Sequence, residues 1–264
     1  MKISYKKMCF ITVFILLIAI IIYLIKTVYF KSKTTSGSKP IVTFVIPSIG
    51  RPTIIRTIKS LQNLTNPNWK AIVVFDGVHS NIDHIKDNRI QVYKIEKSGK
   101  LNMGGATRNY GIDKVTNTEW VGFVDDDDTL APHYIDKLLL DSRRNPTADC
   151  LVFRMYDRDR HKIVPLPHSA SLKKGSVGIS FCVKTNIIKN HKFVNNQFED
   201  FHLLKQISSK HNILLSQNIT YFVKENPIEK IYKRTLTPFI NPIVEDPDEG
   251  QRPNPPAFHS SKLE

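Results

Sequence analysis

Four consecutive carboxylates at residues 125–128 follow directly on the apolar segment VGFV. Like charges at this spacing repel one another, so they are tolerable on a solvated turn or useful around a cation. Two aspartates separated by one residue, such as Asp125 and Asp127, can bind Mg²⁺ or Mn²⁺ through hard oxygen ligands, with the other ligands taken from water and substrate phosphates. The alternative is a solvated or capping turn, in which Asp128 would cap the helix that follows.

A second acidic pair, Glu199 and Asp200, lies in the segment FEDFHLLKQI. Apolar residues recur at helical spacing after the pair, so the two acids fall in the first turn of a helix. Acidic side chains there favour the helix macrodipole, which is one explanation of the pair. A carboxylate separate from a metal-binding cluster can instead accept the proton of a reacting hydroxyl, which is the other.

The elements that must position these acids alternate along the chain. We expect strands at residues 41–46, 71–75, 90–95, 120–124 and 150–153, and helices at residues 53–64, 105–112 and 134–140. This order predicts an α/β fold with a mostly parallel sheet and helices on both faces. Ligands of such sheets bind beyond the carboxyl ends of the strands, where this chain has polar residues at 48–51, at Asp76 and in the acidic run.

Five segments together resemble, in order and spacing, a glycosyltransferase of family two with the GT-A fold. They are IVTFVIPSIGRPTIIRTIKSLQN, IVVFDG, GGATRNYGI, WVGFVDDDDTLAPHYIDKLL and FEDFHLLKQI, and the resemblance covers about residues 41–210. It implies a Rossmann-like GT-A domain of the hexosyltransferase type, which moves a sugar from a nucleoside diphosphate donor to an acceptor hydroxyl with inversion. It also implies a divalent metal, Mn²⁺ or Mg²⁺, at a D-x-D motif.

The resemblance assigns roles to three residues of the two acidic constellations. Asp125 and Asp127 match the D-x-D motif, with Asp127 as the more direct metal ligand and Asp125 also among the donor-binding residues. Asp200 matches the catalytic base, and Glu199 is the other member of the predicted catalytic pair.

The same resemblance implies the remaining donor contacts. Pro47 and Ser48 match the loop that lines the nucleotide pocket, Asp76 matches the acid that contacts the nucleotide base, and Arg108 matches an arginine near the nucleotide. The loop after the first strand lacks the aromatic residue and asparagine that family members often have. This departure leaves the donor open, although a UDP-sugar is favoured, and the acceptor is a glycan, a lipid or a protein.

An uncharged segment near the N-terminus predicts membrane attachment. Residues 8–25, MCFITVFILLIAIIIYLI, would span about 27 Å as a helix, close to the thickness of a bilayer core. The segment lacks the polar face of a buried core helix, and no small-residue cleavage site of a signal peptide follows it. We therefore predict a basic N-terminal segment (1–7), a single-pass anchor (8–25), a stem (26–40), a GT-A domain (41–235) and a Pro-rich acidic tail (236–264).

Orientation and charge give weaker information. Three lysines lie close to each side of the anchor and nearly balance the positive-inside rule, and we expect a type II protein with a lumenal catalytic domain. The formal net charge is +14, of which residues 1–40 contribute +7 because they hold seven lysines and no acid. No basic run with interleaved aromatic residues occurs, which argues against a nucleic-acid partner.

Three alternatives remain open from the sequence. Cys150 and Cys182 lie in strand-like surroundings, either as buried thiols or as one bridge. The Pro-rich tail is either wrapped on the domain or disordered. The rival to an enzyme is a catalytically silent, membrane-anchored module that binds a carbohydrate or nucleotide with the same fold. Retention of both acidic constellations favours the enzyme.

Overall fold

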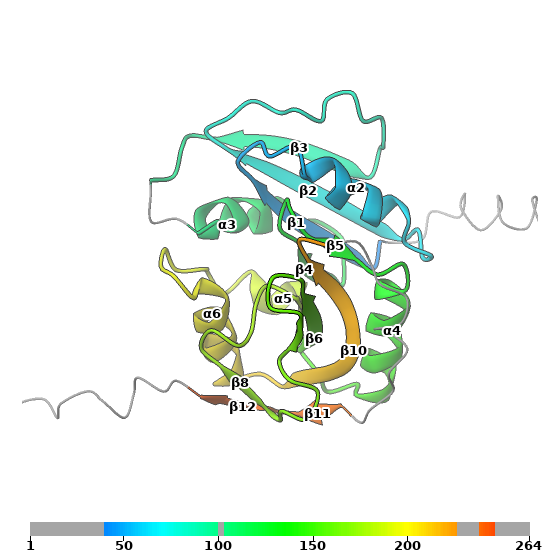
Figure 1. Cartoon of the computed structure of the whole chain (residues 1–264), viewed down its shortest axis with the longest axis vertical. Coiled ribbons are helices and arrows are strands. Elements are labelled where there is room, and N and C mark those ends of the chain that lie inside the picture. The colour runs from blue at the N-terminus through cyan, green and yellow to red at the C-terminus, as the bar shows by residue number, and fades with distance from the viewer. Residues whose placement is uncertain (1–39, 100–102, 226–237, 246–264) are drawn as a thin grey trace, which may run out of the picture. The chain divides into compact units, whose positions relative to one another are not determined.

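The computed structural model describes residues 40–99, 103–225 and 238–245. Within these residues, ten strands form one sheet and two form a small second sheet (Figure 1). The main path through the large sheet runs β11 (Phe239–Ile240), β10 (Ile213–Val223), β6 (Cys150–Asp157), β9 (Phe181–Lys184), β4 (Trp120–Phe123), β1 (Val42–Ser48), β2 (Trp69–Asp76) and β3 (Ile90–Ile95). Off this path, β5 (Thr129–Leu130) pairs with β10 and β7 (Lys162–Val164) pairs with β6.

The sheet is mostly parallel, as predicted. Strands β4, β1, β2 and β3 run parallel to one another, and β10 runs parallel to β6. Strand β9 lies antiparallel between β4 and β6, and the short strands β5, β7 and β11 are also antiparallel to their partners. Strand β9 was not among the predicted strands, because four residues are too few to establish a periodic pattern.

Helices cover both faces of the sheet, which confirms the α/β prediction. They are α2 (Ile54–Gln62), α3 (Gly105–Lys114), α4 (Tyr134–Arg144), α5 (Thr185–Ile188) and α6 (Glu199–Ser208). Successive strand residues point to opposite faces. On β1, Phe44 packs its ring against Tyr134 of α4 at a centroid distance of 5.5 Å, whereas Val45 lies against Gly111 of α3. Figure 1 shows α2 on the same side as α4, opposite α3 and α6.

The close approach of α3 to the sheet depends on Gly111. A Cβ atom at this position would lie 2.4 Å from Cγ1 of Val45, which is closer than two carbon atoms can come. The glycine therefore lets α3 lie directly on β1 and β2. One turn earlier on the same helix is Arg108, which this packing brings to the carboxyl ends of the strands.

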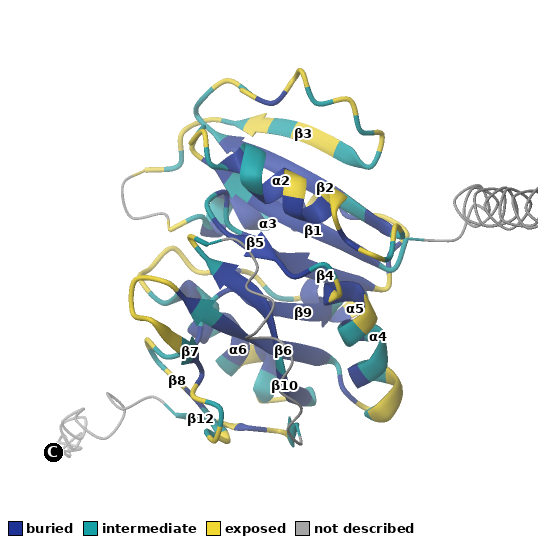
Figure 2. Cartoon of the chain, turned by 45° about the vertical axis from the view of Figure 1, so that its right-hand side comes forward, coloured by how far each residue is buried: buried dark blue, intermediate teal, exposed yellow. Residues whose placement is uncertain are grey.

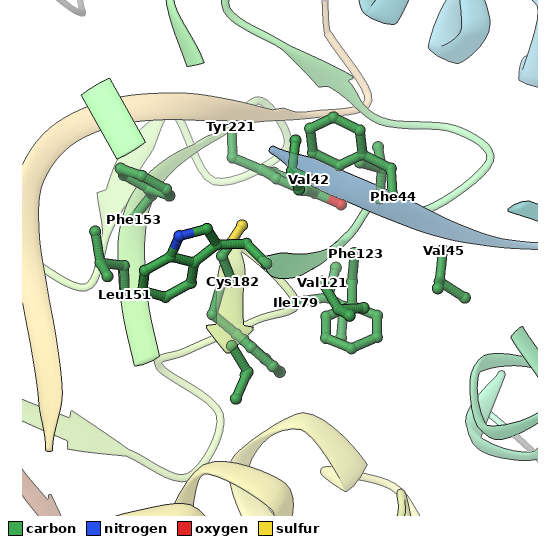
Figure 3. Packing of buried hydrophobic residues seen from close by; sticks show 14 of the residues in the cluster. Val42, Phe44, Val45, Val121, Phe123, Leu151, Phe153, Ile179, Cys182 and Tyr221 are labelled. Carbon is green, nitrogen blue, oxygen red and sulfur yellow. The ribbon is translucent and has the colours of Figure 1, made fainter. Parts of the chain in front are cut away.

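The core lies between the strands and the helices, and Figure 2 shows the central strands buried, whereas the edge strand β3 is partly exposed. Figure 3 shows one cluster in which Phe44, Phe123 and Phe153 come from β1, β4 and β6. All three are fully buried, and truncation of such a phenylalanine to alanine costs about 3–5 kcal/mol. Cys150 and Cys182 belong to this core as free thiols, so the bridge alternative does not hold. Burial raises the pKa of Cys182 to about 12, which keeps its thiol protonated.

The described part of the tail, residues 238–245, lies on the domain rather than apart from it. Strand β11 pairs with β10, and β12 (Ile243–Glu245) pairs with β8 (Ser171–Lys173). Lys173 and Glu245 add an ion pair at 2.8 Å. The Pro-rich composition did not predict these strands, which depend on partners far away in the sequence.

The predicted anchor at residues 8–25 lies outside the described residues, as does most of the predicted stem. Across residues 40–99, 103–225 and 238–245, no helix is both long and apolar enough to cross a membrane.

Candidate active site

The acidic run forms the turn between β4 and β5, and its side chains alternate in exposure. The side chains of Asp125 and Asp127 keep 35% and 20% of their surface exposed, whereas that of Asp126 keeps 5%. Asp128 is also buried. The alternation separates two aspartates that can meet a ligand from two that hold the turn in place.

The two buried aspartates connect the turn to other elements. Asp126 accepts hydrogen bonds from the hydroxyl of Ser48 at 2.8 Å and from the guanidinium of Arg51 at 3.2 Å. Asp128 accepts one from the hydroxyl of Tyr221 at 2.7 Å and one from the backbone N–H that follows β10 at 2.9 Å. Burial raises the pKa of both carboxyl groups, that of Asp128 to about 8. The idea that Asp128 caps the next helix is wrong, because α4 begins later, after His133.

Arg108 joins the two acidic constellations. Its side chain is almost fully buried, and Nη2 donates to Oδ1 of Asp125 at 2.5 Å while Nη1 donates to Oε1 of Glu199 at 2.8 Å. Burial opposes the charge, but the carboxylates of Asp125 and Glu199 outweigh it and raise the pKa of Arg108. The residue before α3 is Gly104, with φ of 90°, and a Cβ atom there would lie 3.0 Å from Nη1 of Arg108. Glycine at position 104 therefore permits the positive φ angle and leaves room for the guanidinium of Arg108.

A cavity of about 280 Å³ lies at the carboxyl ends of β1, β2 and β4. We call it the donor cavity, because all five residues predicted to bind the donor line it: Pro47, Ser48, Asp76, Arg108 and Asp125. Its volume is near the lower end of the range for small-molecule sites. The fold thus brings together residues from four separate sequence segments, as the strand-end argument predicts.

Asp76 is fixed in position at the end of β2. Its carboxylate accepts hydrogen bonds from the backbone N–H of Ser98 at 2.7 Å and from the Ser98 hydroxyl at 2.8 Å. The carboxylate therefore ties the loop after β3 to the rim of the donor cavity.

The predicted catalytic pair divides into two different environments. Glu199 forms the ion pair with Arg108, whereas Asp200 forms no ion pair within the described residues. Burial and the neighbouring charge of Glu199 raise the pKa of Asp200 to about 6. The preceding residue, Phe198, has φ of 123°, a costly backbone region for a side chain with a Cβ atom. Neither acid lines the donor cavity, so Asp200 is separate from the residues predicted to bind the donor. Its raised pKa suits a carboxylate that accepts a proton near neutral pH.

Asp125 and Asp127 fit a divalent cation. Each gives one carboxylate oxygen to an arginine, Oδ1 of Asp125 to Arg108 and Oδ2 of Asp127 to Arg51. Their second oxygens have no other hydrogen bond in the described part of the chain, and hard carboxylate oxygens suit Mg²⁺ and Mn²⁺. The described residues contain no cluster of three or more metal-binding side chains. Asp125 and Asp127 would hold such a cation, with water and substrate phosphates as its other ligands.

Two residues of the site were not singled out from the sequence. Nη1 of Arg51 lies 3.2 Å from Asp126 and 2.9 Å from Asp127, so it bridges neighbouring members of the acidic run. The hydroxyl of Tyr221 accepts a hydrogen bond from the backbone N–H of Asp125 at 3.1 Å while it donates to Asp128. Arg51 stands in a loop that the strand-end argument had already marked, but Tyr221 carries no local signal.

The mostly parallel sheet with helices on both faces is typical of a GT-A-like domain, and comparison with known sequences agrees. Residues 43–221, more than half of the chain, match the family described as "Glycosyl transferase family 2". The chain belongs to this family.

Individual relatives are more distant. A stretch of 107 residues is 34% identical to EpsH of Bacillus subtilis (strain 168), which is named as a candidate glycosyltransferase, and covers 38% of this chain and 30% of EpsH. The crystal structure of residues 1–349 of S. aureus TarS in complex with UDP-GlcNAc aligns with a TM-score of 0.57 at 14% identity, over 74% of this chain and 62% of that TarS fragment. Mannosyltransferase PcManGT from Pyrobaculum calidifontis, in complex with GDP-Man and Mn²⁺, aligns with a TM-score of 0.55 at 15% identity, over 74% of this chain and 59% of PcManGT. The chain thus spans less than two thirds of each of these proteins, and the structural likeness concerns the fold.

Proposed function

We propose that this glycosyltransferase moves a hexosyl group from a nucleoside diphosphate sugar to an acceptor hydroxyl, with inversion and with a bound Mn²⁺ or Mg²⁺. The observation that carries the proposal is the spatial division of the acids. Asp125 lines the donor cavity and Asp127 is the other partly exposed member of the run, whereas Asp200 does not line the cavity and has its pKa raised to about 6.

Asp200 is the general base of the proposed reaction. It accepts the proton of the acceptor hydroxyl while the hydroxyl oxygen forms a bond to the anomeric carbon of the donor. The bond from that carbon to the diphosphate oxygen breaks on the opposite face, and the electron pair leaves with the nucleoside diphosphate. A single displacement of this kind inverts the anomeric configuration.

The arginines and Glu199 support the leaving group. The bound cation would supply charge stabilisation to the diphosphate. Arg108 borders the same cavity and can add positive charge there, because Glu199 and Asp125 keep its guanidinium ionised and oriented. We assign Glu199 to positioning Arg108 and Asp200 to proton transfer.

A UDP-sugar is our favoured donor, and a glycan, lipid or protein is the acceptor. The TarS structure with UDP-GlcNAc supports a UDP-sugar as the donor. Because the PcManGT structure contains GDP-Man, GDP-sugars should be tested as donors as well. We also propose that residues 8–25 anchor the chain as a type II membrane protein with a lumenal catalytic domain. Extraction of expressing membranes at high pH, followed by protease protection of sealed vesicles, tests the anchor and its orientation.

The activity test is a panel of UDP- and GDP-sugars with the full-length chain in a non-ionic detergent. We expect release of nucleoside diphosphate from one donor in Mn²⁺ or Mg²⁺, and loss of release in a chelator. Anomeric configuration of the product, read by NMR, tests inversion. Donor binding without any release, across the panel and with added acceptors, would favour the catalytically silent module instead.

A further inference from the structure

A second cavity, of about 490 Å³, lies between helix α2 and the segment that follows β5. We call it the α2 cavity. It shares no lining residue with the donor cavity, and its volume is well inside the range of sites that hold small molecules. Its polar lining includes Arg56, Lys59 and Asn63, and its apolar lining includes Ile55, Leu130 and Pro132.

The α2 cavity carries two positive charges and no negative one. Arg56 and Lys59 are three residues apart on one face of α2, and Asn63, the residue that caps the C-terminus of the helix, follows four residues later. Neither cation forms an ion pair with any residue that the structure describes, and no acidic residue lines the cavity. Two like charges on neighbouring turns repel each other, and an anion between them would remove that repulsion.

Arg56 also has an unused hydrogen-bond donor. Its Nη2 donates to the backbone carbonyl of Asp127 at 2.6 Å, which fixes the position of the guanidinium. Its Nε atom is shielded from solvent and has no hydrogen-bond partner within the described residues. A buried donor without a partner is uncommon in folded proteins, and here it leaves the positive charge of the Arg56 guanidinium incompletely compensated.

We propose that the α2 cavity binds a phosphate ester group that belongs to a larger molecule. The guanidinium of Arg56, the ammonium of Lys59 and the amide of Asn63 match the oxygens of a phosphate group in charge and in donor type. The cavity is larger than a phosphate alone requires, and the side chains of Ile55 and Leu130 offer apolar contact to the rest of the ligand. This site is separate from the proposed glycosyl transfer and does not depend on it.

The test measures binding to the full-length chain in a non-ionic detergent. Inorganic phosphate and glycerol 3-phosphate probe a soluble ligand by calorimetry, and vesicles of phosphatidylglycerol, compared with phosphatidylcholine, probe a lipid head group by co-flotation. We expect at least one of these phosphate-containing probes to bind, and the probe that binds distinguishes the two sources of the phosphate ester.

Three variants assign the binding to the α2 cavity. Arg56→Gln with Lys59→Gln should weaken it on the order of tenfold to a hundredfold, because two charge-assisted contacts are lost. The matched control, Lys86→Gln with Lys189→Gln, removes the same charge at two exposed positions elsewhere and should leave the affinity within about twofold. Ile55→Trp keeps both cations but fills the cavity, and it should weaken binding as well.

Unchanged binding in both the Arg56 and Lys59 double variant and Ile55→Trp would overturn the proposal. Equal loss in the Lys86 and Lys189 control would also overturn it, since the effect would then reflect overall charge. Thermal melting of each variant separates a lost site from a lost fold, and Ile55→Trp keeps the test valid if the double variant melts early.

Discussion

The donor cavity and the α2 cavity each carry two cationic side chains, yet they differ in how that charge is balanced. Arg51 and Arg108 of the donor cavity are paired with carboxylates of the acidic run, and Arg108 is also paired with Glu199. Arg56 and Lys59 have no such partners among the described residues. The donor cavity is therefore negative overall and attracts a cation first, whereas the α2 cavity can receive an anion directly. The cations of a cavity do not by themselves reveal which ligand it takes.

The largest expected effect is the loss of turnover in Asp200→Asn, which should leave the α2 cavity unaffected. Asparagine keeps the size of the side chain but cannot accept the proton, so turnover should fall on the order of 10²–10⁴. Donor affinity and phosphate affinity at the α2 cavity should stay nearly constant. Initial-rate kinetics beside calorimetry measure all three quantities.

The control for this variant is Glu199→Gln, which should mainly raise KM for the donor because it frees Arg108 from one partner. Normal turnover of Asp200→Asn together with an inactive Glu199→Gln would mean that the base has been assigned to the wrong carboxylate.

A second contrast lies inside the acidic run. Asp127→Asn should lower metal-dependent turnover on the order of 10²–10³, because it weakens the hold on the cation that stabilises the leaving group. Asp126→Asn should instead lower stability by about 1–3 kcal/mol, because its buried carboxylate holds Ser48 and Arg51. Mn²⁺ titration and urea unfolding distinguish the two. Equal loss of activity in both variants, with folding intact, would indicate a generic acidic patch.

The pH profile of turnover should follow the ionisation of Asp200, with a loss of about tenfold at pH 5. Asp200 must be ionised to act as a base, and its raised pKa of about 6 means that turnover falls about tenfold per unit of pH below 6. A profile of kcat against pH that is flat down to pH 4.5 would contradict the role of Asp200.

The smallest expected effect is that of salt. Raising NaCl from about 0.05 to about 0.5 M should weaken phosphate binding at the α2 cavity several-fold, because the Debye length shrinks and the exposed charges are screened. Donor binding should change less, because the arginines of that cavity are already paired with carboxylates. Calorimetric titrations at three salt concentrations measure both affinities. An identical dependence of the two affinities on salt concentration would contradict the proposed difference in charge balance between the cavities.

Much of the site could be predicted because it depends on local patterns. Buried strands followed by polar residues placed Ser48, Asp76 and Asp125 at one edge of a parallel sheet, and the structure lines one cavity with all three. The one-residue spacing of Asp125 and Asp127 also reappears as an alternation of exposure in the turn.

The remaining features depend on contacts between distant segments. Tyr221 contacts Asp128 across 93 positions, and Arg108 contacts Glu199 across 91, and no periodicity in either segment encodes such a pair. Strand β9 is likewise determined by the strands on both of its sides. Sequence patterns indicate which face of an element is buried, but tertiary packing decides which partner covers it.

The strand order also has a consequence for how the chain assembles during synthesis. Strands β1 to β4 form a parallel set completed by residue 123, so the half of the sheet that carries the donor cavity can pair early. The acidic turn is locked only when Tyr221 arrives on β10, about a hundred residues later. Strand β12, which contacts helix α6, arrives later still. Since N-terminal parts of a nascent chain generally fold first, we expect the acidic turn and helix α6 to reach their final positions in the last steps of folding.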